Sequence, residues 1–196
     1  MKPSAAIADA RVIANDPGVT PRYSDALLLG YFNDFMKELA KRKRELFHEI
    51  SEITLVAGEF QAVSRNVTNG LVDIIRNTDK QHVRKVSRQD IEQQAPRWRR
   101  ATISQKPINW CWVVAQNEFD FMVYPAAVAA DKLLVVVANV PTDVVIGSIG
   151  TDITQVSDNY RAAAASYVAG RAIAINTSSV DVQKGITLVN TGLGMI

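Results

Sequence analysis

The sequence predicts an α+β fold in which helices from the two ends of the chain form a bundle around an inserted antiparallel β-domain. Three observations lead to this prediction. A stretch of helical period precedes residue 50, the middle of the chain holds alternating or continuous apolar segments, and helical periodicity returns after residue 158. We expect a helical part at 1–50, a β-rich part at 51–145, and a helical part with a C-terminal tail at 146–196, all within one domain.

The first helical part contains two predicted helices. The first spans residues 4–15, with Ser4 as its cap, and stops at Asp16-Pro17 because proline disfavours a helical conformation in the preceding residue. The second spans about 25–49 and starts at Ser24, a good N-cap. Its apolar residues repeat at three, four and seven positions and therefore share one face, which requires packing partners: Leu28, Phe32, Phe35, Leu39 and Leu46.

The middle of the chain reads as short strands. We expect them at 53–56, 71–76, 83–86, 110–114, 119–124 and 133–138. The pair Asn69-Gly70 is interpreted as a turn, and Ser87 with Asp90 predicts a capping box before a short helix that Pro96 ends. The segments 110–114 and 119–124 resemble a hairpin, and the continuous apolar run at 133–138 indicates burial on both faces. This pattern favours an antiparallel sandwich or meander.

Helical periodicity returns in two final segments. One runs from about residue 158 to 175, capped by Ser157 or Asp158, and the other spans 180–190 with Gly192 as its C-cap. We expect the last residues, 191–196, to form a flexible tail without charged side chains.

Composition excludes several classes of protein. Apolar residues make up 47% and charged residues 21% of the 196 residues, and the net charge is +2, which are values of an ordinary globular protein. The single cysteine, Cys111, rules out an internal disulfide and fits a reducing compartment. Residues 1–17 carry four charges and do not resemble a signal peptide, and the charge-free run 162–170 is too short to span a bilayer. We expect a soluble protein without membrane contact.

The chain shows no catalytic set. His48 and His82 lack acids or thiols at metal-ligand spacing, and Cys111 lies between two tryptophans, where a buried apolar role is expected. The pair Gly192 and Gly194 has no helix after it and cannot cradle a phosphate. Common nucleotide-binding, zinc-protease and hydrolase motifs are missing from the sequence. We therefore expect no enzyme activity, no metal and no cofactor.

Two basic clusters remain to be explained. Between residues 73 and 106 the chain carries nine Lys/Arg against four Asp/Glu, whereas residues 131–196 carry four against five. The run Lys41, Arg42, Lys43 and Arg44 covers the whole circumference of a helix, so it is a solvated helix end, a phosphate contact or a subunit interface. Arg97, Arg99 and Arg100 surround Trp98, either as a stacking platform for nucleic acid or as solvated arginines around an anchored ring. A non-specific nucleic-acid-binding module is therefore one functional hypothesis.

An ordered series of motifs leads to another hypothesis. The segments are ARVIANDPG at 10–18, YSDALL at 23–28, YFND at 31–34, TLVAG at 54–58, APRW at 95–98, FMVYP at 121–125 and PTD at 141–143. In this order they resemble the head-to-tail adaptor, or connector, proteins of tailed bacteriophages. The alanine-rich segment 161–174 and the connection 146–153 depart from that pattern.

The resemblance implies a structural virion protein without enzymatic activity. It implies a ring, typically dodecameric, that is assembled in the host cytoplasm, docks beneath the portal protein, joins a tail or nozzle protein and passes double-stranded DNA without reading its sequence. In such a ring Lys41, Arg42, Lys43, Arg44, Arg97, Arg99 and Arg100 would lie at the channel or at an interface. We also hypothesise that the apolar tail residues Leu193, Met195 and Ile196 insert into a groove on the portal or on a neighbouring subunit, with a frayed terminus as the alternative.

Overall fold

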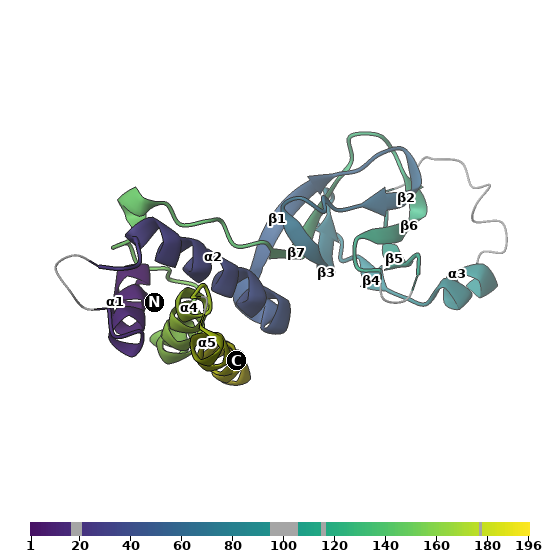
Figure 1. The fold of residues 1–196 in the computed structure, drawn as a ribbon. Coiled ribbons are helices and arrows are strands. Elements are labelled where there is room, and N and C mark those ends of the chain that lie inside the picture. Colours follow the sequence, from purple (N-terminus) through teal and green to yellow (C-terminus); the bar gives the residue numbers. More distant parts are fainter. Residues whose placement is uncertain (17–20, 95–105, 115–116, 177) are drawn as a thin grey trace. The chain divides into compact units, whose positions relative to one another are not determined.

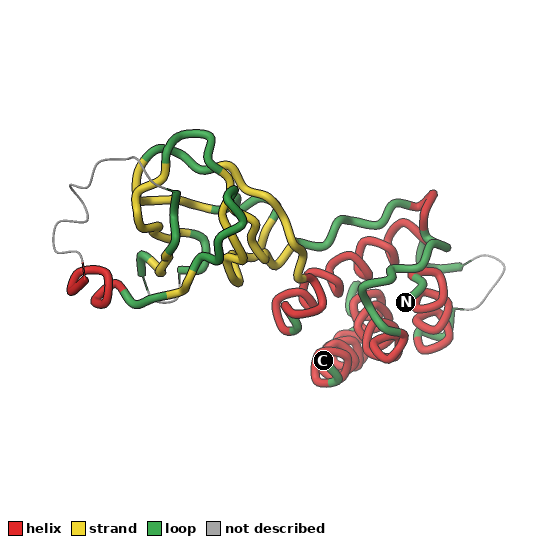
Figure 2. The backbone as a smooth tube through the Cα atoms, turned by 180° about the vertical axis from the view of Figure 1, so that it is seen from behind, coloured by secondary structure: helices red, strands yellow, loops and turns green. Residues whose placement is uncertain are grey.

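A computed structural model of the protein describes residues 1–16, 21–94, 106–114, 117–176 and 178–196. The chain divides into two compact units, Met1–Leu46 with Pro141–Ile196 and Phe47–Val140. We call them the helical unit and the β unit (Figure 1). Four helices make up most of the first unit, and the second holds the strands (Figure 2). The α+β class, with helices from both ends of the chain packed together, is confirmed.

The helical unit is organised around one alanine-rich helix. It contains α1 (Pro3–Ile13), α2 (Asp25–Arg42), α4 (Arg161–Ile173) and α5 (Ser179–Gly194). Helix α4 packs against the other three, and most of its residues are buried. Because its side chains are mainly alanine, neighbouring helices can approach its backbone closely. Phe35 of α2 meets Tyr167 of α4 at a ring-centroid distance of 5.8 Å.

The predicted features of α2 are confirmed at its start and wrong at its end. The Ser24 hydroxyl accepts a hydrogen bond from the Leu27 amide at 3.3 Å, and the apolar residues Leu28, Phe32, Phe35 and Leu39 are buried. The helix ends at Arg42, however, not near residue 49, and a short 3₁₀ turn (Arg44–Phe47) leads into a strand. Residues 48–54 pair with residues 132–138, which lie 78 to 90 positions further along the chain, and this tertiary pairing outweighs the helical prediction for residues 48 and 49.

The first helix also begins earlier than predicted. Its N-cap is Lys2, not Ser4, and Pro3 occupies the first turn, where its missing amide hydrogen costs nothing. The Met1 ammonium donates to Asp152 Oδ1 and to the Val156 carbonyl, each at 2.6 Å. The bond to this ammonium lowers the pKa of Asp152. The connection that returns from the β unit is thereby fastened at the start of α1.

The β unit consists of two stacked sheets. One has the antiparallel order β1 (His48–Thr54), β7 (Lys132–Asn139), β3 (Thr68–Asn77). The other has the order β2 (Gly58–Ala62), β6 (Asp120–Ala127), β5 (Asn109–Trp112), β4 (Arg84–Lys85). Strand β4 runs parallel to β5, so the sheets are not purely antiparallel as predicted. A short helix, α3 (Arg88–Gln94), follows β4.

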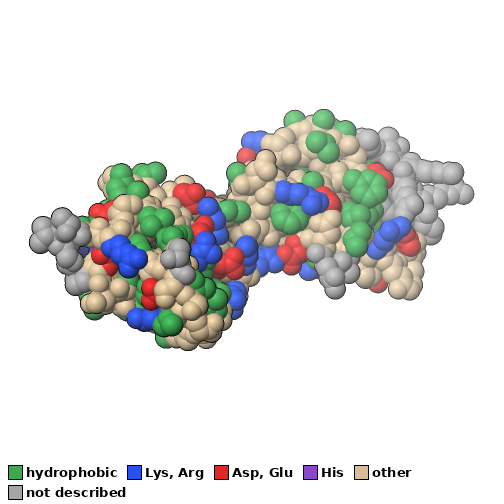
Figure 3. Space-filling model, viewed as in Figure 1, with side chains coloured by type: hydrophobic (Ala, Val, Ile, Leu, Met, Phe, Trp, Pro, Cys, Tyr) green, Lys and Arg blue, Asp and Glu red, His purple; other side chains and the backbone are tan. Residues whose placement is uncertain are grey.

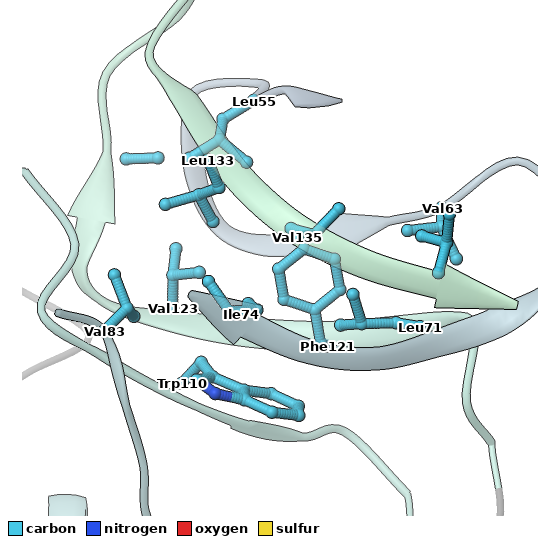
Figure 4. Packing of buried hydrophobic residues seen from close by; sticks show 12 residues of the cluster. Leu55, Val63, Leu71, Ile74, Val83, Trp110, Phe121, Val123, Leu133 and Val135 are labelled. Atoms are coloured by element: carbon cyan, nitrogen blue, oxygen red, sulfur yellow. The ribbon is translucent and has the colours of Figure 1, made fainter. Parts of the chain in front are cut away.

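The hydrophobic core of this unit lies between the two sheets (Figure 4). Trp110 and Phe121 extend from one sheet toward Leu71, Ile74 and Val135 of the other, and all five are buried. The Trp110 and Phe121 rings meet edge to face at 6.4 Å, a favoured aromatic geometry. Burial of large apolar side chains from both sheets stabilises the sandwich.

Several strand predictions are refined by the structure. The predicted hairpin is confirmed, because β5 and β6 pair antiparallel. Asn69-Gly70 does not form a turn but lies inside β3, where the register shifts and Gly70 has φ of 122°. Of the strand expected at 53–56, only Ile53 and Thr54 belong to one, because β1 ends at Thr54. In β7 Leu133, Val135 and Val137 are buried, whereas the intervening residues are only half-buried, so burial on both faces was overestimated.

The predicted capping box before α3 is confirmed. Ser87 Oγ accepts from the Asp90 amide at 3.1 Å, and Asp90 Oδ2 accepts from the Ser87 amide at 3.1 Å and from its hydroxyl at 2.7 Å. These bonds lower the pKa of Asp90.

Candidate interaction surfaces

Helix α5 is held to α4 by glycines at near backbone contact. A Cβ added to Gly185 would lie 2.6 Å from the Gly170 carbonyl oxygen, and one added to Gly170 would lie 2.6 Å from the Gly185 oxygen. At Gly192 a Cβ would lie 2.7 Å from the Ala163 oxygen. No larger side chain fits at these positions, so the three glycines set the distance between the helices.

The opposite face of α5 is exposed and mostly uncharged. Its residues recur at helical spacing and are all exposed: Val180, Gln183, Lys184, Thr187, Asn190, Thr191 and Gly194. Only Asp181 and Lys184 are charged in this helix. A shallow groove of about 510 Å³ runs along it between Val180 and Leu188. In Figure 3 the part of the helical unit formed by α4 and α5 is largely tan and green. A helix face with few charged residues suits contact with another protein surface.

The C-terminal residues are helical rather than a flexible tail. Helix α5 continues to Gly194 and is capped by Met195, so Gly192 is an interior packing residue and not the predicted C-cap. Leu193 and Ile196 are half-buried, whereas Met195 is 54% exposed. The three residues proposed for docking therefore end a fixed helix.

The basic run does not form one surface. Lys41 and Arg42 end α2, Lys43 is its C-cap, and Arg44 lies in the following 3₁₀ turn. Lys41 forms an ion pair with Glu38 at 2.7 Å, and this bond raises the pKa of Lys41. Arg42 donates to the Leu193 carbonyl at 3.2 Å and so joins the end of α2 to the last turn of α5. The structure thus brings one predicted basic residue and the predicted docking segment together.

The second basic cluster lies outside the described residues. Arg97, Arg99, Arg100 and Trp98 all belong to the segment 95–105. Charged residues are divided evenly between the two units, since each unit contains 11 Lys/Arg and 10 Asp/Glu in the sequence, these arginines included. Neither unit carries the strong positive charge that a dedicated nucleic-acid-binding module has.

Among the described residues, no group of acids, histidines and cysteine could hold a metal ion. Cys111 is buried, and burial raises the pKa of its thiol, which disfavours a nucleophilic thiolate. His48 and His82 are exposed. No helix in the described part of the chain is long and apolar enough to cross a bilayer.

The adaptor-like motif residues hold the helical unit together. Arg11 contacts Asp16 at 2.8 Å and Asp25 at 2.6 Å, and the buried Asp16 also accepts the Arg22 and Tyr23 amides at 2.6 and 3.2 Å. These bonds close the connection between α1 and α2 from both sides. The first two motifs, at 10–18 and 23–28, therefore contribute to packing within the helical unit.

Asn33 has a role that sequence reasoning missed. Its side-chain amide donates to the Val144 carbonyl at 3.1 Å and accepts the Val144 amide at 3.0 Å. Lys37, one turn further along α2, pairs with Asp143 at 2.8 Å. The chain returning from the β unit is thus fixed along α2. The only sequence feature that indicated a role for Asn33 was its position inside the YFND motif at 31–34.

Comparison with known proteins identifies the family. A family model described as SU10 adaptor protein matches residues 1–186. A search of curated proteins gave no match. The match covers nearly the whole chain: the N-terminal segment of the helical unit, the entire β unit and most of the C-terminal segment of the helical unit. It confirms the resemblance that the motif series indicated. The chain therefore belongs to the SU10 adaptor family of bacteriophage structural proteins.

Proposed function

We propose that this protein is a head-to-tail adaptor that forms a ring beneath the portal of a phage particle. The ring, taken as a dodecamer, joins the capsid to a tail or nozzle protein and continues the channel through which double-stranded DNA passes. Assembly takes place in the host cytoplasm, and the protein performs no catalysis. The family match over residues 1–186 is the observation that carries this proposal.

The exposed face of α5 supports the proposal. In a closed ring each subunit presents two different surfaces to its neighbours, so a subunit requires more than one contact face. The outward face of α5 is exposed in the isolated chain and carries Lys184 among uncharged residues, and its uncharged part suits burial against a portal or adaptor subunit. Near-neutral units also suit a channel that neither traps nor strongly repels DNA.

We assign the basic residues to the channel or to subunit interfaces. In this assignment Lys41, Lys43 and Arg44 contact a neighbour or passing DNA, and Arg97, Arg99 and Arg100 do the same from the β unit. Arg42 already engages Leu193 within the subunit and serves to orient the C-terminal helix.

Electron microscopy tests the ring. Purified protein is expected to be monomeric or weakly associated alone and to form a closed ring when the portal protein of the same phage is added. A stable closed dimer that persists with portal present would refute the proposal. Tight, salt-sensitive binding of free DNA by the monomer would instead favour the nucleic-acid-binding alternative.

The C-terminal docking contact has its own test. Met195→Asp places a charge on an exposed residue at the end of α5 and is expected to weaken portal binding at least tenfold. Val12→Asp is the matched control, since Val12 is an exposed apolar residue of α1 in the same unit. Equal portal affinity of the two variants would show that the end of α5 does not dock.

A further inference from the structure

Three cationic side chains surround a small pocket on the outer face of the three-stranded sheet. The register sets Glu52 of β1 opposite Leu134 of β7, and Leu134 opposite Arg76 of β3, so the three form one row. Lys132 lies two residues before Leu134 on β7 and therefore on the same face of the sheet, and Lys80 lies in the turn after β3. Arg76, Lys80 and Lys132 line a pocket of about 150 Å³ together with Glu52, Asn77, Thr78 and Leu134.

The positive charges of this pocket exceed the negative ones. Lys132 Nζ is paired with Glu52 Oε1 at 2.6 Å. The nearby Asp79 is paired with Lys106, also at 2.6 Å. In the described part of the chain, neither Arg76 nor Lys80 forms an ion pair, and both are exposed. With one carboxylate and three cations, the lining carries a formal charge of +2.

The turn that carries Lys80 is held rigidly. The buried Asn77 side chain accepts the amides of Asp79 and Gln81, each at 3.0 Å, and donates to the Pro107 carbonyl at 3.0 Å. Lys80 itself has φ of 63°, a left-handed conformation that asparagine or glycine adopts more readily than lysine. The turn thus presents a lysine at a position whose backbone conformation asparagine or glycine adopts more readily.

We propose that this pocket binds a phosphate group. Arg76 on a strand and Lys80 in the following turn, neither paired with an acid in the described part of the chain, line the cavity of about 150 Å³ together with Thr78. Arg and Lys donors gathered at one cavity favour a dianion or a phosphodiester over chloride. The phosphate belongs either to a free anion or to a DNA backbone. The site lies within one subunit and does not rest on the formation of a ring.

Solution NMR on the full-length protein tests the site directly. Inorganic phosphate is titrated at constant ionic strength against sodium chloride, and the backbone amides of residues 76–81 are followed. Saturable shifts with phosphate but not with chloride are expected. Lys80→Asn removes the charge while keeping a residue that tolerates the left-handed conformation, and it should weaken phosphate binding about tenfold.

Three further variants separate recognition of phosphate from structural effects. Lys80→Arg should retain binding, and Lys184→Gln, which removes a lysine from α5, should leave it unchanged. Glu52→Gln should tighten binding, because it removes the only carboxylate of the pocket and frees Lys132. An unchanged affinity in Lys80→Asn, or shifts equal to those with chloride, would overturn the proposal.

A short DNA duplex of arbitrary sequence distinguishes the two phosphate sources. If the site takes a DNA backbone, duplex binding weakens with salt, and Lys80→Asn lowers the slope of log affinity against log salt by about one. Phosphate binding without such a change assigns the pocket to a free phosphate.

Discussion

Replacement of Gly185 by alanine tests whether glycines set the α4–α5 distance. An alanine Cβ at this position would lie 2.6 Å from the Gly170 carbonyl oxygen and 2.8 Å from the Ala174 amide nitrogen. Both are backbone atoms, which cannot rotate away as a side chain would. Ordinary contact begins at 3.4 Å, so the backbones must separate by about 0.8 Å at this point.

Two opposing effects determine the change in stability. Alanine is more favourable than glycine inside a helix by about 0.5–1 kcal/mol. Overpacking of a tight contact costs about 1–3 kcal/mol. We therefore expect Gly185→Ala to lower the free energy of unfolding of the helical unit by about 0.5–2 kcal/mol. Gly30 lies exposed inside α2 with no atom within 4 Å of its added Cβ, so Gly30→Ala should raise stability by about 0.5–1 kcal/mol.

Two optical signals separate the units in a urea titration. Circular dichroism at helical wavelengths mainly follows the helical unit, whereas all three tryptophans belong to the β unit. Gly185→Ala should shift the dichroism transition to lower urea, and Gly30→Ala should shift it to higher urea. If both alanine variants gain the same stability, the glycines do not set the distance between α4 and α5.

Three other changes test separate features of the fold. Ser87→Ala should raise the pKa of Asp90, followed by NMR titration of its carboxyl. In the wild type the pKa of Asp90 lies below its value in the unfolded chain. The ionised capping box therefore stabilises the fold at pH values above the unfolded pKa, and this stabilisation is lost as the pH falls through the folded-state pKa. An unchanged pKa of Asp90 in the variant would contradict the hydrogen-bond origin of the shift. Asn33→Ala leaves the Val144 amide and carbonyl unpaired and should cost about 1–3 kcal/mol in urea unfolding, whereas Asn190→Ala on the exposed face of α5 should cost little; equal losses would argue against an anchoring role. Arg42→Ala should speed hydrogen exchange in the last turn of α5, while Lys41→Ala, which loses only its pair with Glu38, should not.

Features set by local interactions were predictable from the sequence. The Ser24 cap and the Ser87 capping box each depend on residues three positions apart, and the apolar face of α2 follows directly from its period. The class of the fold followed from the same local patterns.

Features set by distant partners were not predictable in this way. The helix predicted for residues 25–49 ends at Arg42, because residues 48–54 pair with β7 far along the chain. Gly192 resembles a helix cap, but its distance of seven residues from Gly185 places both on the face that meets α4. The cationic pocket combines residues of three strands and a turn, which no local pattern brings together.

The pairing of β1 with β7 has a consequence for the modular design of the protein. The chain enters the β unit at Phe47 and leaves it at Val140, and His48 lies directly opposite Ala138. Opposed residues of antiparallel strands have Cα atoms only about 4.5–5.5 Å apart. The whole of the β unit can therefore be excised and its two ends bridged by a tight turn, or another domain with adjacent termini can be grafted at the same junction. Residues 47–140 therefore form a module that can be replaced while the helices of the helical unit keep their connections.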